Sequence, residues 1–413
     1  MTNHERFLSG GAGMMRESGI RRMSALAQHH AGGRGVDLIS FAPGHPAPAM
    51  FAWDDFRDIA AKLLDGTDPA VLQYGATRGE SGLLDALVAI LATRGVRAAR
   101  EETIVTSGSQ QALDLAARVF IDPGDVVLLE LPTYTGAITA FANAQARLTG
   151  VPQDGDGIDL DELDRTLVRE RGAGRRIAFL YVVPNFQNPT GQLVSLQKRR
   201  ALLDWAASRD VLIVEDDPYG AIYFEDLTDA ASTRPIKADD ADGRVVYMSS
   251  FSKTVAPGFR VAWIAAPAPI VARMDVAKQA IDLCTGTLDQ RIIRELWNRG
   301  TLSARLPILR AFYQGKRASM EQALRREFGD TVRWTAPAGG FFVWVQLPGG
   351  LDAEAMLPLA TSHGVLYVAG SAFYVDGRTS DCLRLSFAAP PPERINEGVR
   401  RLAAAIAEAR VAA

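Results

Sequence analysis

The chain has 413 residues, 47% of them hydrophobic and 23% charged, a composition typical of a globular protein. A formal net charge of −3 gives no indication of nucleic-acid binding. Only two cysteines occur, Cys284 and Cys382, and no apolar run has the length of a membrane span. We therefore predict a cytoplasmic protein without a disulfide framework, a metal site or a membrane segment.

The first predicted unit, residues 1–45, is a polar arm punctuated by glycines. Apolar residues recur at helical spacing in 20–27, where Arg22 lies either on a solvated face or in a site. A short strand at 38–41 then enters a turn that contains Gly44. The next clear element is an amphipathic helix at 83–93.

Five short apolar runs follow, and each ends in a cluster of polar or small residues: 103–106, 126–129, 177–183, 211–214 and 245–248. The runs are continuous rather than alternating, which is typical of parallel strands covered on both faces. Helical segments lie between them, as crossover connections require. We therefore expect the polar clusters to meet at one edge of a parallel sheet, where open α/β sheets bind ligands.

Two of these clusters indicate an anion site. Ser109 and Gln110 stand at the start of a predicted helix, where free N–H groups favour a phosphate, although a plain serine cap is the better explanation of this cluster taken alone. After the last run, Ser250, Ser252 and Lys253 are followed by Arg260. A desolvated lysine near other cations loses its proton readily and becomes a nucleophile for carbonyl groups.

Beyond residue 290 the pattern changes to that of a smaller α+β unit. Its predicted strands cover 333–335, 340–347, 365–368 and 382–387, and a helix covers 393–409. The predicted organisation is thus an arm at 1–45, a large domain at 46–290 and a small domain at 291–413.

Three motifs carry a family resemblance: Asn188-Pro189-Thr190-Gly191, Asp216-x-x-Tyr219, and Ser252-Lys253 with Arg260. With them the chain resembles the fold-type I aminotransferases that use pyridoxal 5′-phosphate (PLP), and in particular the 2-aminoadipate and kynurenine aminotransferases. The likeness spans residues 41–387. It implies an α/β fold, with a large domain whose mostly parallel sheet is flanked by helices and a smaller α+β domain. Ala262 departs from the pattern, which has glycine there, and leaves the local backbone path open.

The resemblance implies three catalytic residues. Lys253 would hold PLP covalently and move a proton on the substrate. Asp216 would contact the pyridine nitrogen and keep it protonated, so that the ring accepts electrons. Tyr219, the third, would hydrogen-bond the 3′ oxygen of the ring, and the cofactor-binding Asn188 would do the same.

The remaining cofactor contacts also follow from the resemblance. Tyr134 would stack on the ring, unless it is an ordinary core aromatic. The phosphate would be held by Ser109, Gln110, Ser250, Ser252 and Arg260, with either Ser250 or Ser252 in direct contact. Tyr74 would reach the phosphate of a neighbouring subunit, which implies a homodimer with shared active sites.

For the substrate, the resemblance implies that Arg384 binds the α-carboxylate by a bidentate fork. Asn188, Gly44 and Arg22 would complete the substrate site. The implied reaction transfers the amino group of an L-amino acid to a 2-oxo acid such as 2-oxoglutarate, with ping-pong kinetics. The donor, of 2-aminoadipate, aromatic or branched-chain type, stays open.

Three alternatives remain at this point. A lyase, racemase or decarboxylase could use the same PLP scaffold. A PLP-binding regulatory domain is disfavoured, because too little chain precedes residue 38 to form a DNA reader. A nucleotide-binding protein is unsupported, because no Gly-x-Gly-x-x-Gly sequence opens a helix.

Overall fold

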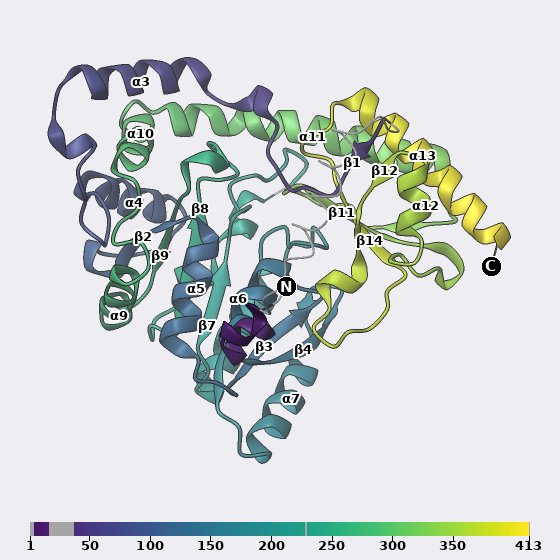
Figure 1. Cartoon of the computed structure of the whole chain (residues 1–413), viewed down its shortest axis with the longest axis horizontal. Coiled ribbons are helices and arrows are strands. Elements are labelled where there is room, and N and C mark those ends of the chain that lie inside the picture. The colour runs from purple at the N-terminus through teal and green to yellow at the C-terminus, as the bar shows by residue number, and fades with distance from the viewer. Residues whose placement is uncertain (1–3, 16–36, 228, 413) are drawn as a thin grey trace.

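The computed structural model describes residues 4–15, 37–227 and 229–412 (Figure 1). It confirms the predicted α/β fold: helices flank a large mixed sheet, and a smaller sheet forms a second layered unit. Its α-helices are α1 (Gly10–Met14), α3 (Trp53–Asp65), α4 (Ser81–Thr93), α5 (Ser109–Phe120), α6 (Thr135–Asn143), α7 (Leu160–Gly172), α8 (Leu196–Arg209), α9 (Ala268–Gln279), α10 (Thr287–Asn298), α11 (Thr301–Phe328), α12 (Leu357–Ser362) and α13 (Pro392–Ala412). The division at residues 45 and 290 stays a prediction.

The large sheet has eight strands in the order β2-β9-β8-β7-β6-β3-β4-β5. In chain order these are β2 (Thr103–Ser107), β3 (Val126–Leu131), β4 (Arg147–Asp154), β5 (Gly157–Ile158), β6 (Ile177–Val182), β7 (Ile213–Asp216), β8 (Val245–Ser250) and β9 (Val261–Ala265). From β4 through β3, β6 and β7 to β8 all pairings are parallel. The five predicted apolar runs are thus β2, β3, β6, β7 and β8.

Strand β9 is antiparallel to both of its neighbours, β2 and β8. Because it separates them, β2 still points in the same direction as β8, and the five predicted polar clusters do end at one edge. The connection from β8 to β9, residues 251–260, is too short for a helical crossover, which explains the reversal. Ala262 lies fully buried in β9, paired with Thr106 and Ser250.

Side chains alternate between the two faces of this sheet, and the alternation separates the cores. On one face, Tyr181 of β6 and Val214 of β7 pack with residues of α5, α6 and α9. On the other face, Leu180 and Ile213 pack with residues of α7 and α8. Further along this second face, residues of β2, β8 and β9 pack with α4 and α10. Consecutive residues of one strand therefore pack against different helices, on opposite faces of the sheet.

The smaller sheet is antiparallel, with strands in the order β10 (Arg333–Trp334), β11 (Phe342–Gln346), β14 (Cys382–Ser386) and β13 (Val368–Ala369). Beside it, β1 (Ile39–Ser40) pairs in parallel with β12 (Val365–Leu366). The predicted strand at 365–368 is thus divided into β12 and β13 at Tyr367.

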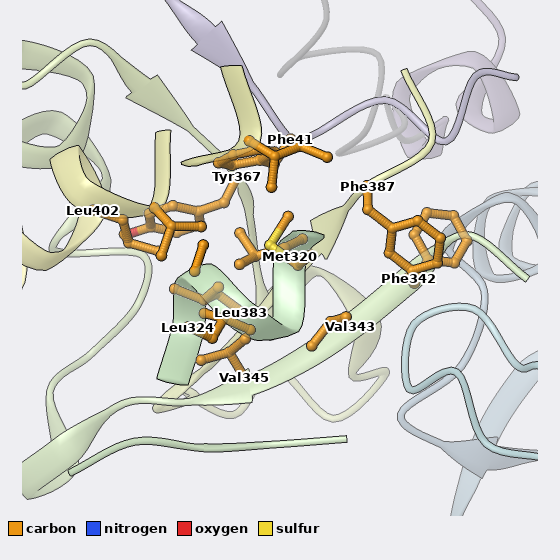
Figure 2. Packing of buried hydrophobic residues seen from close by; sticks show 14 of the residues in the cluster. Phe41, Met320, Leu324, Phe342, Val343, Val345, Tyr367, Leu383, Phe387 and Leu402 are labelled. Carbon is orange, nitrogen blue, oxygen red and sulfur yellow. The ribbon is translucent and has the colours of Figure 1, made fainter. Parts of the chain in front are cut away.

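The core of this smaller unit lies between its sheet and helices α11 and α13. Figure 2 shows Met320 and Leu324 of α11 against Val343 and Val345 of β11. Phe342 and Phe387 lie together at one end of the cluster. Phe342, the first residue of β11, thus lies at the edge of the smaller core.

Within the described ranges, no helix combines the length and the apolar character that a bilayer crossing requires.

Candidate active site

The predicted site residues gather at the carboxyl edge of the large sheet and meet one strand of the smaller sheet. Asp216 is the last residue of β7, and Lys253 comes three residues after β8. Arg384 belongs to β14. The loop after β6 carries Asn188. The structure therefore joins residues that lie 196 positions apart in sequence, as in the hydrogen bond between Asn188 and Arg384.

The Lys253 amine lies among rings and one carbonyl. Its Nζ donates a hydrogen bond to the Gly44 carbonyl at 2.9 Å. The same atom lies 5.7 Å from the centre of the Tyr219 ring and 6.0 Å from that of Phe341. Burial, with the nearby charges of Arg384 and Arg260, lowers the pKa of Lys253 to about 8, although Asp216 opposes the shift. A lysine in this state supplies a neutral amine far more readily than an exposed one.

Asp216 is buried and only half satisfied. The Tyr181 hydroxyl donates to its Oδ2 at 2.8 Å, whereas its Oδ1 has no hydrogen-bond partner among the described residues. Burial raises the pKa of this carboxyl to about 7. A buried acceptor without a donor costs stability, and such groups are rare outside functional sites. The free oxygen suits a donor from a bound ligand.

Arg384 is fully buried, and both of its described hydrogen bonds go to neutral oxygens. Its Nη1 donates to Asn188 Oδ1 at 2.7 Å, and its Nη2 donates to the Ala42 carbonyl. The guanidinium carbon lies 4.2 Å from the centre of the Phe342 ring and 5.2 Å from that of Phe373. Its Nε has no partner in the described part of the chain, and burial lowers the pKa of the guanidinium to about 10. A buried cation held this way is suited to an anionic ligand.

A second group of residues surrounds the start of α5. Gly108, directly before the helix, has a φ of 82°, and a Cβ at this position would come 2.0 Å from Arg260 Nη2. Only glycine therefore lets Arg260 lie against the helix N-terminus. The first turn of α5 begins with Ser109 and Gln110, whose side-chain amide donates to the Gly136 carbonyl at 3.1 Å. Free N–H groups next to a guanidinium favour an anion.

Ser250 and Ser252 form a pair of hydroxyls at the end of β8. The Ser250 hydroxyl donates to the Ser252 hydroxyl at 2.8 Å and accepts from the Ser252 backbone N–H at 2.9 Å. Which of the two contacts a ligand stays a prediction.

The two site tyrosines have different surroundings. Tyr219 is buried, and its ring meets those of Phe341 and Phe342 edge-on, with centroids 5.5 and 5.7 Å apart. Burial raises the pKa of Tyr219, so its hydroxyl stays protonated. Tyr134 stands at the start of α6, where a Cβ on Gly136 would come 2.5 Å from its ring. Gly136 therefore leaves the space that this ring occupies.

Two predicted residues stand apart from this constellation. Tyr74 is 78% exposed. It lies on a loop that is joined to α10 by the hydrogen bond from Thr287 Oγ1 to the Gln73 carbonyl at 2.8 Å. Arg22 lies outside the described residues, so its part in the site stays a prediction. Within the described ranges, no cluster of three or more His, Cys, Asp or Glu side chains could hold a metal.

The site residues that were not predicted from the sequence include Tyr181, Gly108, Phe342 and Phe373. Gly108 carried a signal, because it lies between two serines before a helix. Tyr181 resembles a core aromatic in an apolar run, and only the pairing of β6 with β7 reveals its role. Phe342 and Phe373 reach the site through the packing of the smaller sheet.

Comparison with known proteins identifies related enzymes over nearly the whole chain. Residues 47–402 match the family model "aminotransferase class I and II". Aromatic-amino-acid aminotransferase 1 of Thermococcus litoralis is 38% identical over 98% of this chain and 95% of its own.

Two solved structures are also similar. The multiple substrate aminotransferase of Thermococcus profundus has a TM-score of 0.92 at 39% identity and covers 100% of both chains. The α-aminoadipate aminotransferase of Thermus thermophilus, complexed with N-(5′-phosphopyridoxyl)-L-leucine, has a TM-score of 0.87 at 38% identity, with 99% of both chains covered.

Proposed function

This chain belongs to the class I and II aminotransferases, a family whose members use PLP, and from that premise we propose that the constellation around Lys253 and Asp216 is its PLP site. One observation carries the proposal: a lysine with a lowered pKa lies within electrostatic reach of a buried carboxylate whose Oδ1 is unpartnered among the described residues. When bound, PLP supplies an aldehyde that reacts with amines and a ring that accepts electrons.

The residues present fit this cofactor. Lys253 would supply an amine for the aldehyde, and Asp216 Oδ1 would supply an acceptor for a protonated ring nitrogen. Ser109, Gln110 and Arg260, with Ser250 or Ser252, would hold the phosphate at the α5 N-terminus. Tyr134 would stack on the ring, while Asn188 and Tyr219 would donate to its 3′ oxygen.

The substrate is proposed to bind through its α-carboxylate. In the described part of the chain Arg384 has an unpartnered Nε, and its Nη1 contacts the amide oxygen of Asn188, so an incoming carboxylate can replace that partner. Gly44 lies beside the Lys253 amine, and Arg22 would act from the arm. Lys253 would then act as the base that takes the proton from the substrate Cα, as a group of pKa about 8 can do near neutral pH.

The proposed reaction moves the amino group of an L-amino acid of 2-aminoadipate, aromatic or branched-chain type to 2-oxoglutarate, by a ping-pong mechanism. The names of the similar enzymes, which include aromatic and α-aminoadipate donors and multiple substrates, support a broad range. A screen of amino donors against 2-oxoglutarate would identify the preferred one. Net racemisation, decarboxylation or elimination without oxo-acid turnover would favour the rival PLP chemistries.

We further propose a cytoplasmic homodimer with shared active sites. The exposed Tyr74 ring is available to a second copy of the chain, and both cysteines are free thiols, as expected in a reducing compartment. Sedimentation of the wild type and of Tyr74→Phe, together with PLP affinity, would test this. A monomer with full activity would contradict it.

The cofactor assignment is tested by Lys253→Ala. Purified wild-type protein saturated with PLP should absorb in the visible range, and borohydride should attach the cofactor to Lys253, as detected by peptide mass spectrometry. Lys253→Ala should lose both the label and turnover, because no other amine replaces the nucleophile and base. Wild-type rates in that variant would contradict the proposal.

A further inference from the structure

The hydrogen bond between Tyr181 and Asp216 joins two fully buried side chains on adjacent strands. The relative exposure of Tyr181 is 0% and that of Asp216 is 2%. The bond measures 2.8 Å from the hydroxyl to Oδ2. Within the described ranges it is the one side-chain hydrogen bond that Asp216 receives. The orientation of this carboxylate therefore depends on a single donor.

Strand pairing explains how the hydroxyl reaches the carboxylate. Tyr181 of β6 pairs with Val214 of β7, two residues before Asp216, so all three side chains point to the same face of the sheet. The tyrosine ring packs edge-on against Phe141 of α6, with centroids 5.5 Å apart. This ring contact and the pairing of the strand fix the position of the hydroxyl.

We propose that Tyr181 is a positioning residue of the aminotransferase: by donating to Oδ2 of Asp216 it aims Oδ1 at the cofactor ring nitrogen and keeps the shared proton on that nitrogen. The proposal rests on the proposed PLP site. It assigns Tyr181 no contact with cofactor or substrate; its effect passes through Asp216.

The chemistry follows from what a neutral donor does to a carboxylate. A hydrogen bond to the ionised form stabilises that form and makes the carboxylate a weaker base. Burial and the negative charge of Asp217 favour the protonated form instead, whereas Lys253 favours the ionised one. Without the Tyr181 hydroxyl, the proton on the ring nitrogen would pass to Oδ1, leaving a neutral ring and a neutral acid. No electrons are exchanged, but the neutral ring is the poorer electron acceptor.

Tyr181 is suited to remain this donor. Burial, together with the neighbouring Asp216 charge, raises the pKa of its phenol well above the ordinary value, so it stays protonated across the working pH range.

A matched control lies one strand away. Tyr247 of β8 pairs with Glu215, two residues before Asp217, and its hydroxyl donates to Asp217 Oδ2 at 3.0 Å. Tyr247 is thus the same residue type as Tyr181 and has the same register relative to its aspartate. It is bonded to Asp217, the carboxylate next to Asp216, on the opposite face of the sheet. Tyr181→Phe and Tyr247→Phe each remove one hydroxyl from one buried carboxylate and keep the ring.

The test loads wild type, Tyr181→Phe and Tyr247→Phe with PLP labelled with ¹⁵N in the ring and records the ¹⁵N chemical shift at pH 7. Wild type and Tyr247→Phe should show the protonated nitrogen, whereas Tyr181→Phe should move toward the unprotonated position. Losing a hydrogen bond to a charged group corresponds to at least about a tenfold change in the proton equilibrium. The rate of the amino-acid half-reaction should fall by about the same factor.

Equal ¹⁵N shifts and equal half-reaction rates in the two variants would overturn the proposal. The Asp216→Asn background is a second test: if Tyr181 acts through Asp216, adding Tyr181→Phe there should cost no further rate. A full additional tenfold loss would also overturn the proposal. Failure of the wild-type protein to bind PLP would instead overturn the proposed function, and this inference with it.

Discussion

Asp216 and Asp217 are consecutive buried carboxylates with opposite surroundings. Asp217 accepts from four donors: Arg94 at 3.1 Å, Tyr247 at 3.0 Å, and Asn185 and the Gly220 N–H at 2.9 Å each. Among the described residues, the side chain of Asp216 accepts from Tyr181 alone, and its Oδ1 has no partner.

The same contrast separates one arginine in each region, the half-buried Arg94 and the fully buried Arg384. Arg94 donates to the Asp217 carboxylate and to the carbonyls of Gly220 and Thr233. Arg384 contacts an amide oxygen and one carbonyl, and its Nε is unpartnered in the described part of the chain. The region around Asp217 is thus closed by the chain itself, whereas the region around Asp216 has unused donors and acceptors. Buried donors and acceptors without partners indicate that the region around Asp216 is the one that binds a ligand.

The largest expected effect comes from the two aspartates. Asp216→Asn should lower kcat/KM for transamination by roughly three orders of magnitude, because a neutral amide no longer stabilises a protonated ring nitrogen. Asp217→Asn should spare the chemistry but destabilise the fold by on the order of 3 kcal/mol, because Arg94 loses its counter-ion. Steady-state kinetics and urea denaturation of both variants would check this. Similar losses of activity in both would break the contrast.

Substitutions of the two arginines should also differ, one affecting activity and the other stability. The effect on activity should be smaller than that of the aspartate substitution. Arg384→Ala should raise KM for amino acids about a hundredfold and leave simple amines unaffected, because it removes the carboxylate fork. Arg94→Ala should leave both KM values unchanged and lower stability by about 3 kcal/mol, because Asp217 is left charged and buried. Kinetics with an amino acid and its decarboxylated analogue would decide. A parallel loss with both substrates would remove Arg384 from the carboxylate site.

A third prediction contrasts two lysines whose pKa is lowered, the half-buried Lys253 and the buried Lys316. Burial lowers the pKa of both Lys253 and Lys316 to about 8, but Lys316 donates to two carbonyls, of Ala389 and Pro390, and so has little freedom to react. Because the pKa of Lys253 is about 8 and not near its usual value, its amine changes from mostly charged to mostly neutral between pH 7 and 9. Attachment of PLP to apo-protein should therefore accelerate about tenfold from pH 7 to 9. Stopped-flow absorbance would give the profile, and borohydride labelling should mark Lys253 and not Lys316. A flat profile, or label on Lys316, would contradict the prediction.

The smallest effect is expected for Tyr247→Phe. Asp217 keeps three donors, so the variant should lose about 1 kcal/mol of stability and no catalytic rate. Thermal unfolding and kcat would be measured together. A clear drop in kcat would show that the region around Asp217 also contributes to catalysis.

The sequence alone determined the main elements and much of the site. Apolar runs predicted β2, β3, β6, β7 and β8, because a strand buried on both faces needs continuous hydrophobic residues. The polar residues at their ends predicted a ligand edge, and the motifs around Asn188, Asp216 and Lys253 indicated the family. These features are local, since each depends on residues close together in the chain.

Tertiary structure decided what depends on partners distant in sequence. Strand order placed β9 antiparallel between β2 and β8, and packing of the smaller sheet brought Phe342 and Phe373 onto Arg384. Register put Tyr181 beside Asp216 and Tyr247 beside Asp217, which made neighbours in sequence unlike in chemistry. Whether a buried polar atom finds a partner depends on every element packed around it. For that reason the sequence could name Asp216, but only the fold shows that one of its oxygens is left for a ligand.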